Sequence, residues 1–183
     1  MSVYRACDLL LVPNMVSAAR IPLAIAFPIA IRRARRDRIE VALGIVLAAA
    51  ATDVLDGLIA RYRDEATPTG ALVDGIADKI FGASVLGTLV VGRMLAPSLA
   101  MVLAARELGE LALAARLLVH PSEALAATVD RRANGLGKVA TTAEFAAVVA
   151  VLLNVPWRTL LVGVAATFGA AAAISYWRRE SPR

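Results

Sequence analysis

The sequence has 183 residues, of which 59% are hydrophobic, and its mean hydropathy is +0.68. Soluble domains contain about 45–50% apolar residues, so the composition indicates an integral membrane protein that has little length left for a separate soluble domain. The net charge of +5 points to anionic lipid headgroups or anionic substrates and argues against a nucleic-acid partner. Cys7 is the single cysteine, which excludes a disulfide within the chain.

The predicted elements are all helical. Residues 2–12 carry a few polar side chains among apolar ones and predict a short interfacial helix. Six stretches that can each span a bilayer follow, at residues 13–31, 41–60, 70–92, 97–119, 135–153 and 157–177. The sequence therefore predicts an all-α integral membrane bundle of six transmembrane helices, forming one domain over residues 1–183. We expect no cleaved signal peptide, because the first apolar stretch continues to Ile31 without a small-residue cleavage site.

The first predicted span contains three polar residues, Asn14, Ser17 and Arg20, in its first two turns. An arginine inside a membrane is unfavourable unless it faces a polar cavity or an anionic group. We therefore expect Arg20 to face a polar cavity or an anionic partner, and pairing with a carboxylate is one alternative.

Four aspartates flank the polar turn at residues 62–69. Asp53 and Asp56 are three residues apart at the end of the second span, and Asp74 and Asp78 are four residues apart at the start of the third. A hairpin of these two helices would aim the four carboxylates at one another, and they would repel unless cations lay among them. Oxygen ligands suit Mg²⁺ or Mn²⁺, and two such ions bridged by carboxylates commonly serve displacement at phosphorus.

Residues 53–78 read D-x2-D-G-x2-A-R-x8-G-x3-D-x3-D and resemble the signature of the CDP-alcohol phosphotransferases, with all eight fixed positions at the family spacing. Three flanking motifs resemble bacterial phosphatidylglycerophosphate synthases: Pro13-Asn14-x2-Ser17-x2-Arg20, Ala105-Arg106-Glu107 and Gly137-Lys138-x2-Thr141-Thr142. The resemblance implies a six-span enzyme of the cell (inner) membrane, commonly homodimeric, with its active site at the cytoplasmic face. Such enzymes transfer the phosphatidyl group of CDP-diacylglycerol to an alcohol and release CMP. The Lys and Arg distribution of this chain favours that orientation only modestly.

The resemblance also implies roles for the aspartates. Asp53, Asp56 and Asp74 would hold one divalent ion, either Mg²⁺ or Mn²⁺. Asp53, Asp74 and Asp78 would hold a second ion, and Asp78 would be the base that takes the proton of the acceptor hydroxyl.

Further residues are assigned by the same resemblance to the CDP-lipid. Gly57 and Ala60 would let the nucleotide approach the helix backbone, and Arg61 would grip the pyrophosphate. Thr67 stands where the family often has a hydroxyl residue that contacts the nucleotide. Gly70 belongs to the same predicted CDP-lipid site, and Asn14 and Ser17 are further candidates on the cytidine side.

The acceptor is predicted from basic residues that would form a pocket for a phosphorylated alcohol such as glycerol 3-phosphate: Arg106, Lys138, Arg116 and Arg131. Two departures from the synthase pattern weaken that assignment. Ala140 stands where a second lysine is common, and Glu144 stands where glutamine is common, so the pocket would lose a cation and gain an anion. Inositol phosphate and phosphatidylglycerol therefore remain alternative acceptors.

Other interpretations remain open. The aspartates would also suit a non-catalytic ion-binding carrier of lipids or solutes, although no second copy of the hairpin marks an inverted repeat. Arg106 would equally form an internal ion pair with a glutamate of its own helix, and Lys138 would equally extend to the interface. Small residues at 82, 83, 87 and 92 favour close helix contact and accompany the prediction of a homodimer.

Overall fold

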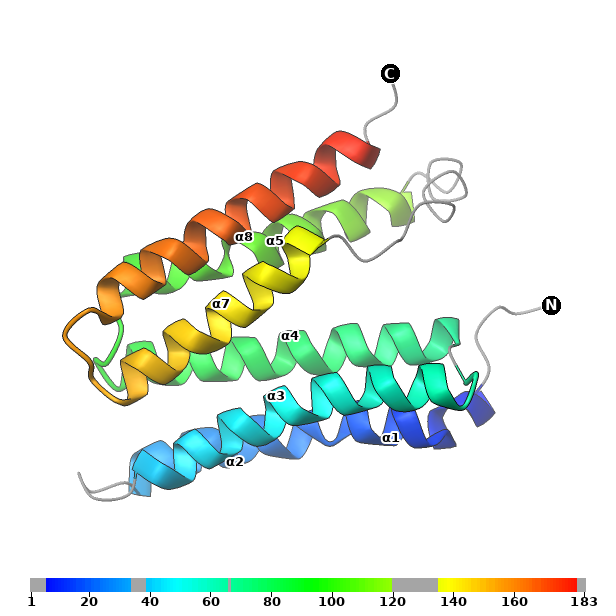
Figure 1. Ribbon diagram of the computed structural model, residues 1–183, viewed down its shortest axis with the longest axis horizontal. Coiled ribbons are helices and arrows are strands. Elements are labelled where there is room, and N and C mark those ends of the chain that lie inside the picture. Colours follow the sequence, from blue (N-terminus) through cyan, green and yellow to red (C-terminus); the bar gives the residue numbers. More distant parts are fainter. Residues whose placement is uncertain (1–5, 34–38, 66, 120–134, 181–183) are drawn as a thin grey trace. The chain divides into compact units, whose positions relative to one another are not determined.

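The computed structural model describes residues 6–33, 39–65, 67–119 and 135–180, and the regular elements within these ranges are all helical (Figure 1). In chain order they are η1 (Ala6–Leu10), α1 (Val12–Ala18), α2 (Arg20–Arg33), α3 (Ile39–Tyr62), α4 (Pro68–Val91), α5 (Pro97–Val119), α7 (Gly135–Leu152) and α8 (Arg158–Glu180). The all-α class is confirmed for these residues. The chain divides into two compact units, Met1–Leu95 and Ala96–Arg183, and each unit is described by itself. Whether they constitute one domain stays a prediction.

The helix boundaries follow local chemistry. Thr67 caps α4, because its hydroxyl accepts a hydrogen bond from the backbone N–H of Gly70 at 3.0 Å, and Pro68 occupies the first helical position. The loops after α4 and α7 each turn through a residue with positive φ, Arg93 at 55° and Asn154 at 51°. The predicted spans from residue 41 onward match α3, α4, α5, α7 and α8 to within a few residues.

The first predicted span, residues 13–31, lies within the helical segment Val12–Arg33, which the prediction did not expect to be divided into α1 and α2 at Ala19. Pro22 lacks the backbone N–H that would bond to the carbonyl of Ala18, and this missing bond coincides with the end of α1. The interfacial helix predicted at residues 2–12 appears as the short 3-10 helix η1; residues 2–5 lie outside the described residues.

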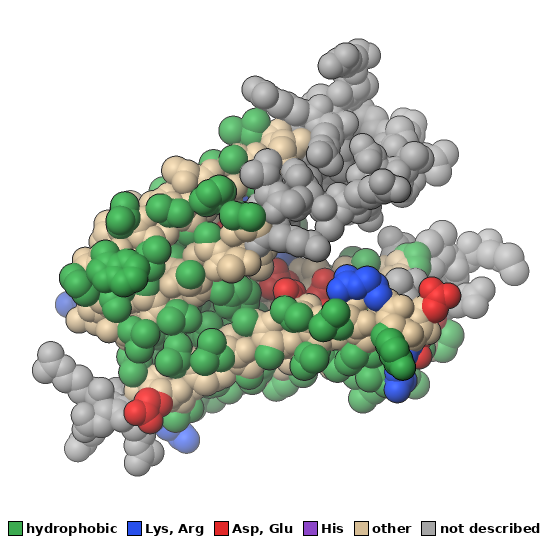
Figure 2. Space-filling view, in the orientation of Figure 1, with side chains coloured by type: hydrophobic (Ala, Val, Ile, Leu, Met, Phe, Trp, Pro, Cys, Tyr) green, Lys and Arg blue, Asp and Glu red, His purple; other side chains and the backbone are tan. Residues whose placement is uncertain are grey.

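Three described helical segments are long and apolar enough to cross a membrane: Val12–Arg33, Ile39–Tyr62 and Arg158–Ser175. Val139–Leu152 is a shorter apolar helix. Both α4 and α5 carry several charged residues, so their composition alone does not mark them as spans. Hydrophobic side chains cover much of the visible surface of the described helices (Figure 2), as a lipid environment requires. The chain is thus a helical membrane protein by composition, and the count of six spans stays a prediction.

In the first unit, the first span lies between the two helices that carry the aspartates. Both α1 and α2 pack against α3 and α4, and they are the chief packing partners of these two helices within the unit. The buried core of this unit contains side chains from the first span, α3 and α4, including Phe27 of α2, Val46 of α3 and Leu89 of α4. The polar residues of the first span therefore face both aspartate-bearing helices.

In the second unit, α8 packs against both α5 and α7. Alanines are frequent among the buried residues of α7 and α8, and Ala147 and Ala165 are fully buried. Small side chains of this kind let neighbouring helices approach closely in a membrane.

The small residues predicted to mediate close contact on α4 face open space in the described part of the chain. A Cβ added at Gly82 or Gly87 would meet no atom within 4 Å. These two glycines therefore do not mediate close packing among the described residues, and the homodimer stays a prediction.

Candidate active site

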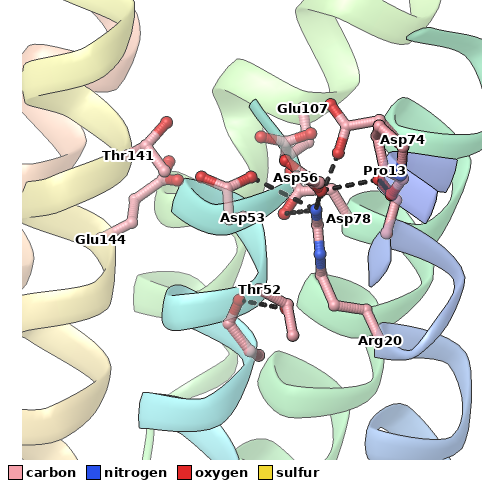
Figure 3. Close-up of polar contacts among 12 residues, drawn as sticks. Pro13, Arg20, Thr52, Asp53, Asp56, Asp74, Asp78, Glu107, Thr141 and Glu144 are labelled. Carbon is pink, nitrogen blue, oxygen red and sulfur yellow. Dashed lines mark hydrogen bonds and ion pairs between the residues drawn. The ribbon is translucent and has the colours of Figure 1, made fainter. Parts of the chain in front are cut away.

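A single arginine lies among the four signature aspartates (Figure 3). Arg20 Nη1 is 3.3 Å from Asp53 Oδ1 and 3.7 Å from Asp78 Oδ1. Arg20 Nη2 donates a hydrogen bond to Asp74 Oδ1 at 2.8 Å and another to Asp56 Oδ2. The four carboxylates therefore converge as the sequence predicted, and Arg20 has the anionic partners expected of it. We call Arg20 and these four aspartates the carboxylate cluster.

The four carboxylates differ in how open they are. The Asp56 side chain is only 9% exposed, and it accepts a hydrogen bond from Ser17 Oγ at 2.6 Å. The Asp53, Asp74 and Asp78 side chains are 36%, 45% and 33% exposed. Asp56 is therefore held inside the unit by α1 and α2, while the other three carboxylates remain accessible to a bound group.

Helix geometry explains why these residues meet. Asp53 and Asp56 occupy the last turns of α3, and Asp74 and Asp78 lie in successive turns near the start of α4. Spacings of three and four residues put each pair on one face of its helix. Because α2 packs against both helices, a long side chain near its start reaches both pairs.

The donor set fits divalent metal ions in chemistry and charge. One guanidinium among four carboxylates leaves three formal negative charges, and carboxylate oxygens are the ligands that Mg²⁺ and Mn²⁺ prefer. As the side chains stand, however, no group of three or more His, Cys, Asp or Glu residues in the described ranges is arranged around a common metal position. The carboxylates are oriented toward Arg20 instead. Metal binding would therefore require Arg20 to yield some of these contacts.

A second set of polar contacts joins the N-terminal segment to the start of α4. Asn14 Nδ2 donates a hydrogen bond to the carbonyl oxygen of Asp8 at 2.6 Å, and Thr69 Oγ1 donates one to Asp8 Oδ2 at 3.1 Å. Gly70 lies directly against Asn14: a Cβ at this position would clash with Asn14 Oδ1 and would lie 3.2 Å from Thr67 Oγ1. Gly70 thus allows η1, α1 and α4 to meet beside the carboxylate cluster.

The residues predicted to bind the CDP-lipid are distributed around the two aspartate helices. Arg61 is exposed, and its Nη1 would be 3.7 Å from a Cβ at Gly57, so the guanidinium lies over the glycine one turn earlier. Thr67 caps α4, while Asn14 and Ser17 are buried and already hydrogen-bonded within the unit. Ala60 is half-buried on α3. Nucleotide contacts by these residues stay predictions.

Arg106, predicted to bind the acceptor, is buried in the second unit. Its Nη2 is 2.6 Å from Glu107 Oε1 and 3.4 Å from Glu144 Oε2, and its Nη1 donates a hydrogen bond to Thr141 Oγ1 at 2.9 Å. We call these four residues the Arg106 cluster. Glu144, the acidic departure noted in the sequence, therefore partly neutralises Arg106 and lessens its attraction for an acceptor phosphate.

The other positions of the predicted acceptor pocket are less defined. Ala140 is fully buried, so a lysine there would be buried as well. The side chains of Arg116 and Lys138 and the whole of Arg131 lie outside the described residues. Their acceptor roles stay predictions.

Sequence reasoning did not include Arg20, Asp8 or Thr69 among the site residues. For Arg20 the signal was present, because an arginine inside an apolar helix requires an anionic partner. For Asp8 and Thr69 the sequence offered no comparable signal, since an acidic residue before a helix and a threonine in a turn are both ordinary.

Comparisons with known proteins agree with the site. The family model described as CDP-alcohol phosphatidyltransferase matches residues 10–175. The chain is 35% identical over 79 residues to the CDP-diacylglycerol–glycerol-3-phosphate 3-phosphatidyltransferase of Pseudomonas fluorescens, which covers 43% of this chain and 40% of the relative. It is 56% identical over 43 residues to the cardiolipin synthase (CMP-forming) of Oryza sativa subsp. japonica, which covers 24% of this chain and 13% of the relative. The matches thus span less than half the length of either curated relative.

The family model covers most of the chain, including both units and every residue of the carboxylate cluster. The resemblance read from residues 53–78 is therefore confirmed. This chain belongs to the CDP-alcohol phosphatidyltransferase family.

Proposed function

We propose that this protein is a divalent-metal-dependent phosphatidyltransferase of phospholipid synthesis, which transfers the phosphatidyl group of CDP-diacylglycerol to a polar alcohol and releases CMP. The observation that carries the proposal is the convergence of Asp53, Asp56, Asp74 and Asp78, the family's signature carboxylates, in one cluster. We further propose a homodimer in the cell (inner) membrane, with the carboxylate cluster at the cytoplasmic face.

The proposed reaction is one displacement at phosphorus. The acceptor hydroxyl oxygen forms a bond to the phosphorus that carries diacylglycerol, the pyrophosphate bond to that phosphorus breaks, and CMP leaves with the bonding electrons. Asp78, 33% exposed at the open side of the cluster, takes the hydroxyl proton. Two divalent ions held by the four aspartates would neutralise the pyrophosphate charge. The exposed Arg61 is the candidate contact for the pyrophosphate.

Glycerol 3-phosphate is the preferred acceptor in this proposal. It is supported by the similarity to the Pseudomonas phosphatidyltransferase and by the flanking motifs, although the match covers only part of that relative. Phosphatidylglycerol is a second candidate, favoured by the pairing of Arg106 with Glu107 and Glu144, which reduces the positive charge available to a small phosphorylated acceptor. The similarity to the rice cardiolipin synthase supports the same candidate.

The test is CMP release by the purified full-length protein with CDP-diacylglycerol and Mg²⁺, across glycerol 3-phosphate, inositol phosphate, inositol, serine and phosphatidylglycerol. We expect release with glycerol 3-phosphate. Release with phosphatidylglycerol instead would establish the second candidate. Cation-dependent binding of lipid or solute with no CMP release from any acceptor would contradict the proposal and favour a non-catalytic carrier.

A further inference from the structure

Arg20 is a buried cation that contacts all four aspartates of the carboxylate cluster. Its side chain is fully buried, and its two terminal nitrogens lie within 3.7 Å of oxygens from all four aspartates. The sequence separations between Arg20 and these partners, such as 54 residues to Asp74, show that tertiary packing rather than local sequence creates the arrangement. One side chain from α2 therefore holds together carboxylates from two other helices.

The same contacts oppose metal binding. A divalent ion that took three or more of these carboxylates as ligands would lie a few ångströms from a buried guanidinium, and like charges at that separation repel strongly where water is scarce. Arg20 and such an ion would draw on the same four carboxylate groups. Arg20 and a metal ion would therefore compete for the same four aspartates.

Arg20 is also incompletely satisfied in this arrangement. Its Nε and Nη1 are buried and have no hydrogen-bond partner among the residues that the structure describes, although Nη1 lies 3.3 Å from Asp53 Oδ1. A buried donor without a hydrogen bond destabilises its surroundings. Nη1 contacts Asp53 and Asp78 as ion pairs, so a cation that replaced these two contacts would break no hydrogen bond of Nη1.

We propose that Arg20 is a built-in counter-cation that stabilises the carboxylate cluster in the metal-free protein and competes with divalent ions for the same aspartates. The inference rests on the proposed function insofar as it takes these aspartates as the metal ligands. Arg20 is a positioning residue in this account, because it acts through the carboxylates. It lets the membrane-embedded helices assemble before metal arrives, and it sets how tightly metal binds.

The test is the affinity of Mn²⁺ for purified full-length protein, measured by electron paramagnetic resonance of free Mn²⁺ in wild type, Arg20→Met and Arg20→Lys. Arg20→Met removes the charge and retains an unbranched side chain, and we expect it to bind Mn²⁺ about ten-fold more tightly. Arg20→Lys keeps a positive charge, and we expect its affinity to remain within about three-fold of wild type. Mn²⁺ binding that is unchanged or weaker in Arg20→Met would overturn the proposal, since a purely structural arginine gives that result.

Thermal unfolding supplies the second readout. In EDTA we expect Arg20→Met to unfold at a lower temperature than wild type, and in Mn²⁺ to recover most of the difference, because the ion replaces the missing cation. If folded Arg20→Met protein can be purified only in the presence of Mn²⁺, that result would also support the proposal. If Arg20→Met is not recovered at all, Arg20→Gln takes its place with the same expected direction. Equal destabilisation with and without Mn²⁺ would overturn the proposal.

The two proposals fail in distinguishable ways. If wild type binds Mn²⁺ and Arg20→Met binds it more tightly, but no acceptor yields CMP, the counter-cation inference stands and the proposed function falls. If wild type releases CMP and Arg20→Met shows no gain in Mn²⁺ affinity, the function stands and this inference falls.

Discussion

Two buried arginines, one in each unit, have opposite surroundings. Arg20 lies among four carboxylates, and three of these are at least 33% exposed. Arg106 lies between Glu107 and Glu144 and also bonds to Thr141, so its charge is met by two carboxylates and a hydroxyl. The first arrangement keeps a large excess of negative charge at an open position, as a cation-binding site requires. The second leaves one formal negative charge, and its contacts between α5 and α7 suit a role in helix packing.

The largest expected effect is on the catalytic rate, at the carboxylate cluster. Asp78→Asn removes the proposed base, and we expect CMP release to fall by about 10²- to 10⁴-fold because general-base catalysis contributes about that factor. Asp64→Asn is the matched control: Asp64 is exposed in the turn after α3 at φ 55°, a conformation that asparagine tolerates. Turnover by Asp78→Asn at the rate of the control would show that the base is another group.

The Arg106 cluster should instead respond in stability. Arg106→Met leaves Glu107 and Glu144 without their shared cation, and we expect it to destabilise the protein by about 3 kcal/mol, measured as a shift in thermal unfolding. Arg63→Met is the control, because Arg63 is exposed and its closest carboxylate contact is 3.9 Å. A rise in the KM for glycerol 3-phosphate at unchanged stability would contradict this expectation and would support Arg106 as an acceptor-binding residue.

A smaller effect is expected beside the carboxylate cluster, at Gly70. Gly70→Ala places a methyl group against Asn14 Oδ1, and we expect it to destabilise the protein by about 1–3 kcal/mol through overpacking. Gly75→Ala on the same helix is the control, because a Cβ there meets nothing within 4 Å and alanine favours helix by up to about 1 kcal/mol. Equal unfolding temperatures for the two variants would mean that Asn14 moves aside without loss.

The smallest effect concerns the cap of α4. Thr67→Val removes the hydroxyl that accepts the Gly70 N–H, and we expect thermal unfolding to show a loss of about 1 kcal/mol. Thr167→Val removes an exposed hydroxyl that donates a hydrogen bond to Val164 of its own helix, and it should change stability by less than about 0.5 kcal/mol. If Thr67→Val retained full stability but bound cytidine nucleotide more weakly, the nucleotide contact predicted from sequence would gain support.

The difference between the two arginines was only partly predictable from sequence. The convergence of the aspartates was predicted, because spacings of three and four residues put each pair on one face of its helix. That the first span lies between the two helices and joins the pairs through Arg20 was not predicted. The helix start at Pro97 was predicted, since proline suits the first helical turn. The span predicted from residue 70 begins two residues earlier, at Pro68, for the same reason. An anionic partner was expected for Arg20, and the pairing of Arg106 with Glu107 fits the ion pair within its own helix that the sequence offered as an alternative. Which carboxylates Arg20 contacts, and the contact of Arg106 with Glu144, were not predictable, because they depend on which helices pack together. The role of Gly70 likewise depends on the position of Asn14 in the folded chain.

The division of the first span was missed for a local reason. Pro22 lies inside an apolar stretch that satisfies the length of a transmembrane helix, and hydrophobicity alone does not register the backbone bond that proline removes at Ala18. The break matters for the proposed site, because Arg20 begins α2 immediately after it and from there reaches both aspartate helices.

The most direct test of the central claim is CMP release by wild-type protein that has been treated with EDTA and then titrated with Mg²⁺ or Mn²⁺, with CDP-diacylglycerol and glycerol 3-phosphate as substrates. If the carboxylate cluster is a metal-dependent transfer site, activity is absent after EDTA and returns with the added ion. In Asp74→Asn, which removes one of the four converging charges, we expect the return to need higher metal concentration. Full activity in EDTA, or a return that Asp74→Asn leaves unchanged, would contradict the account.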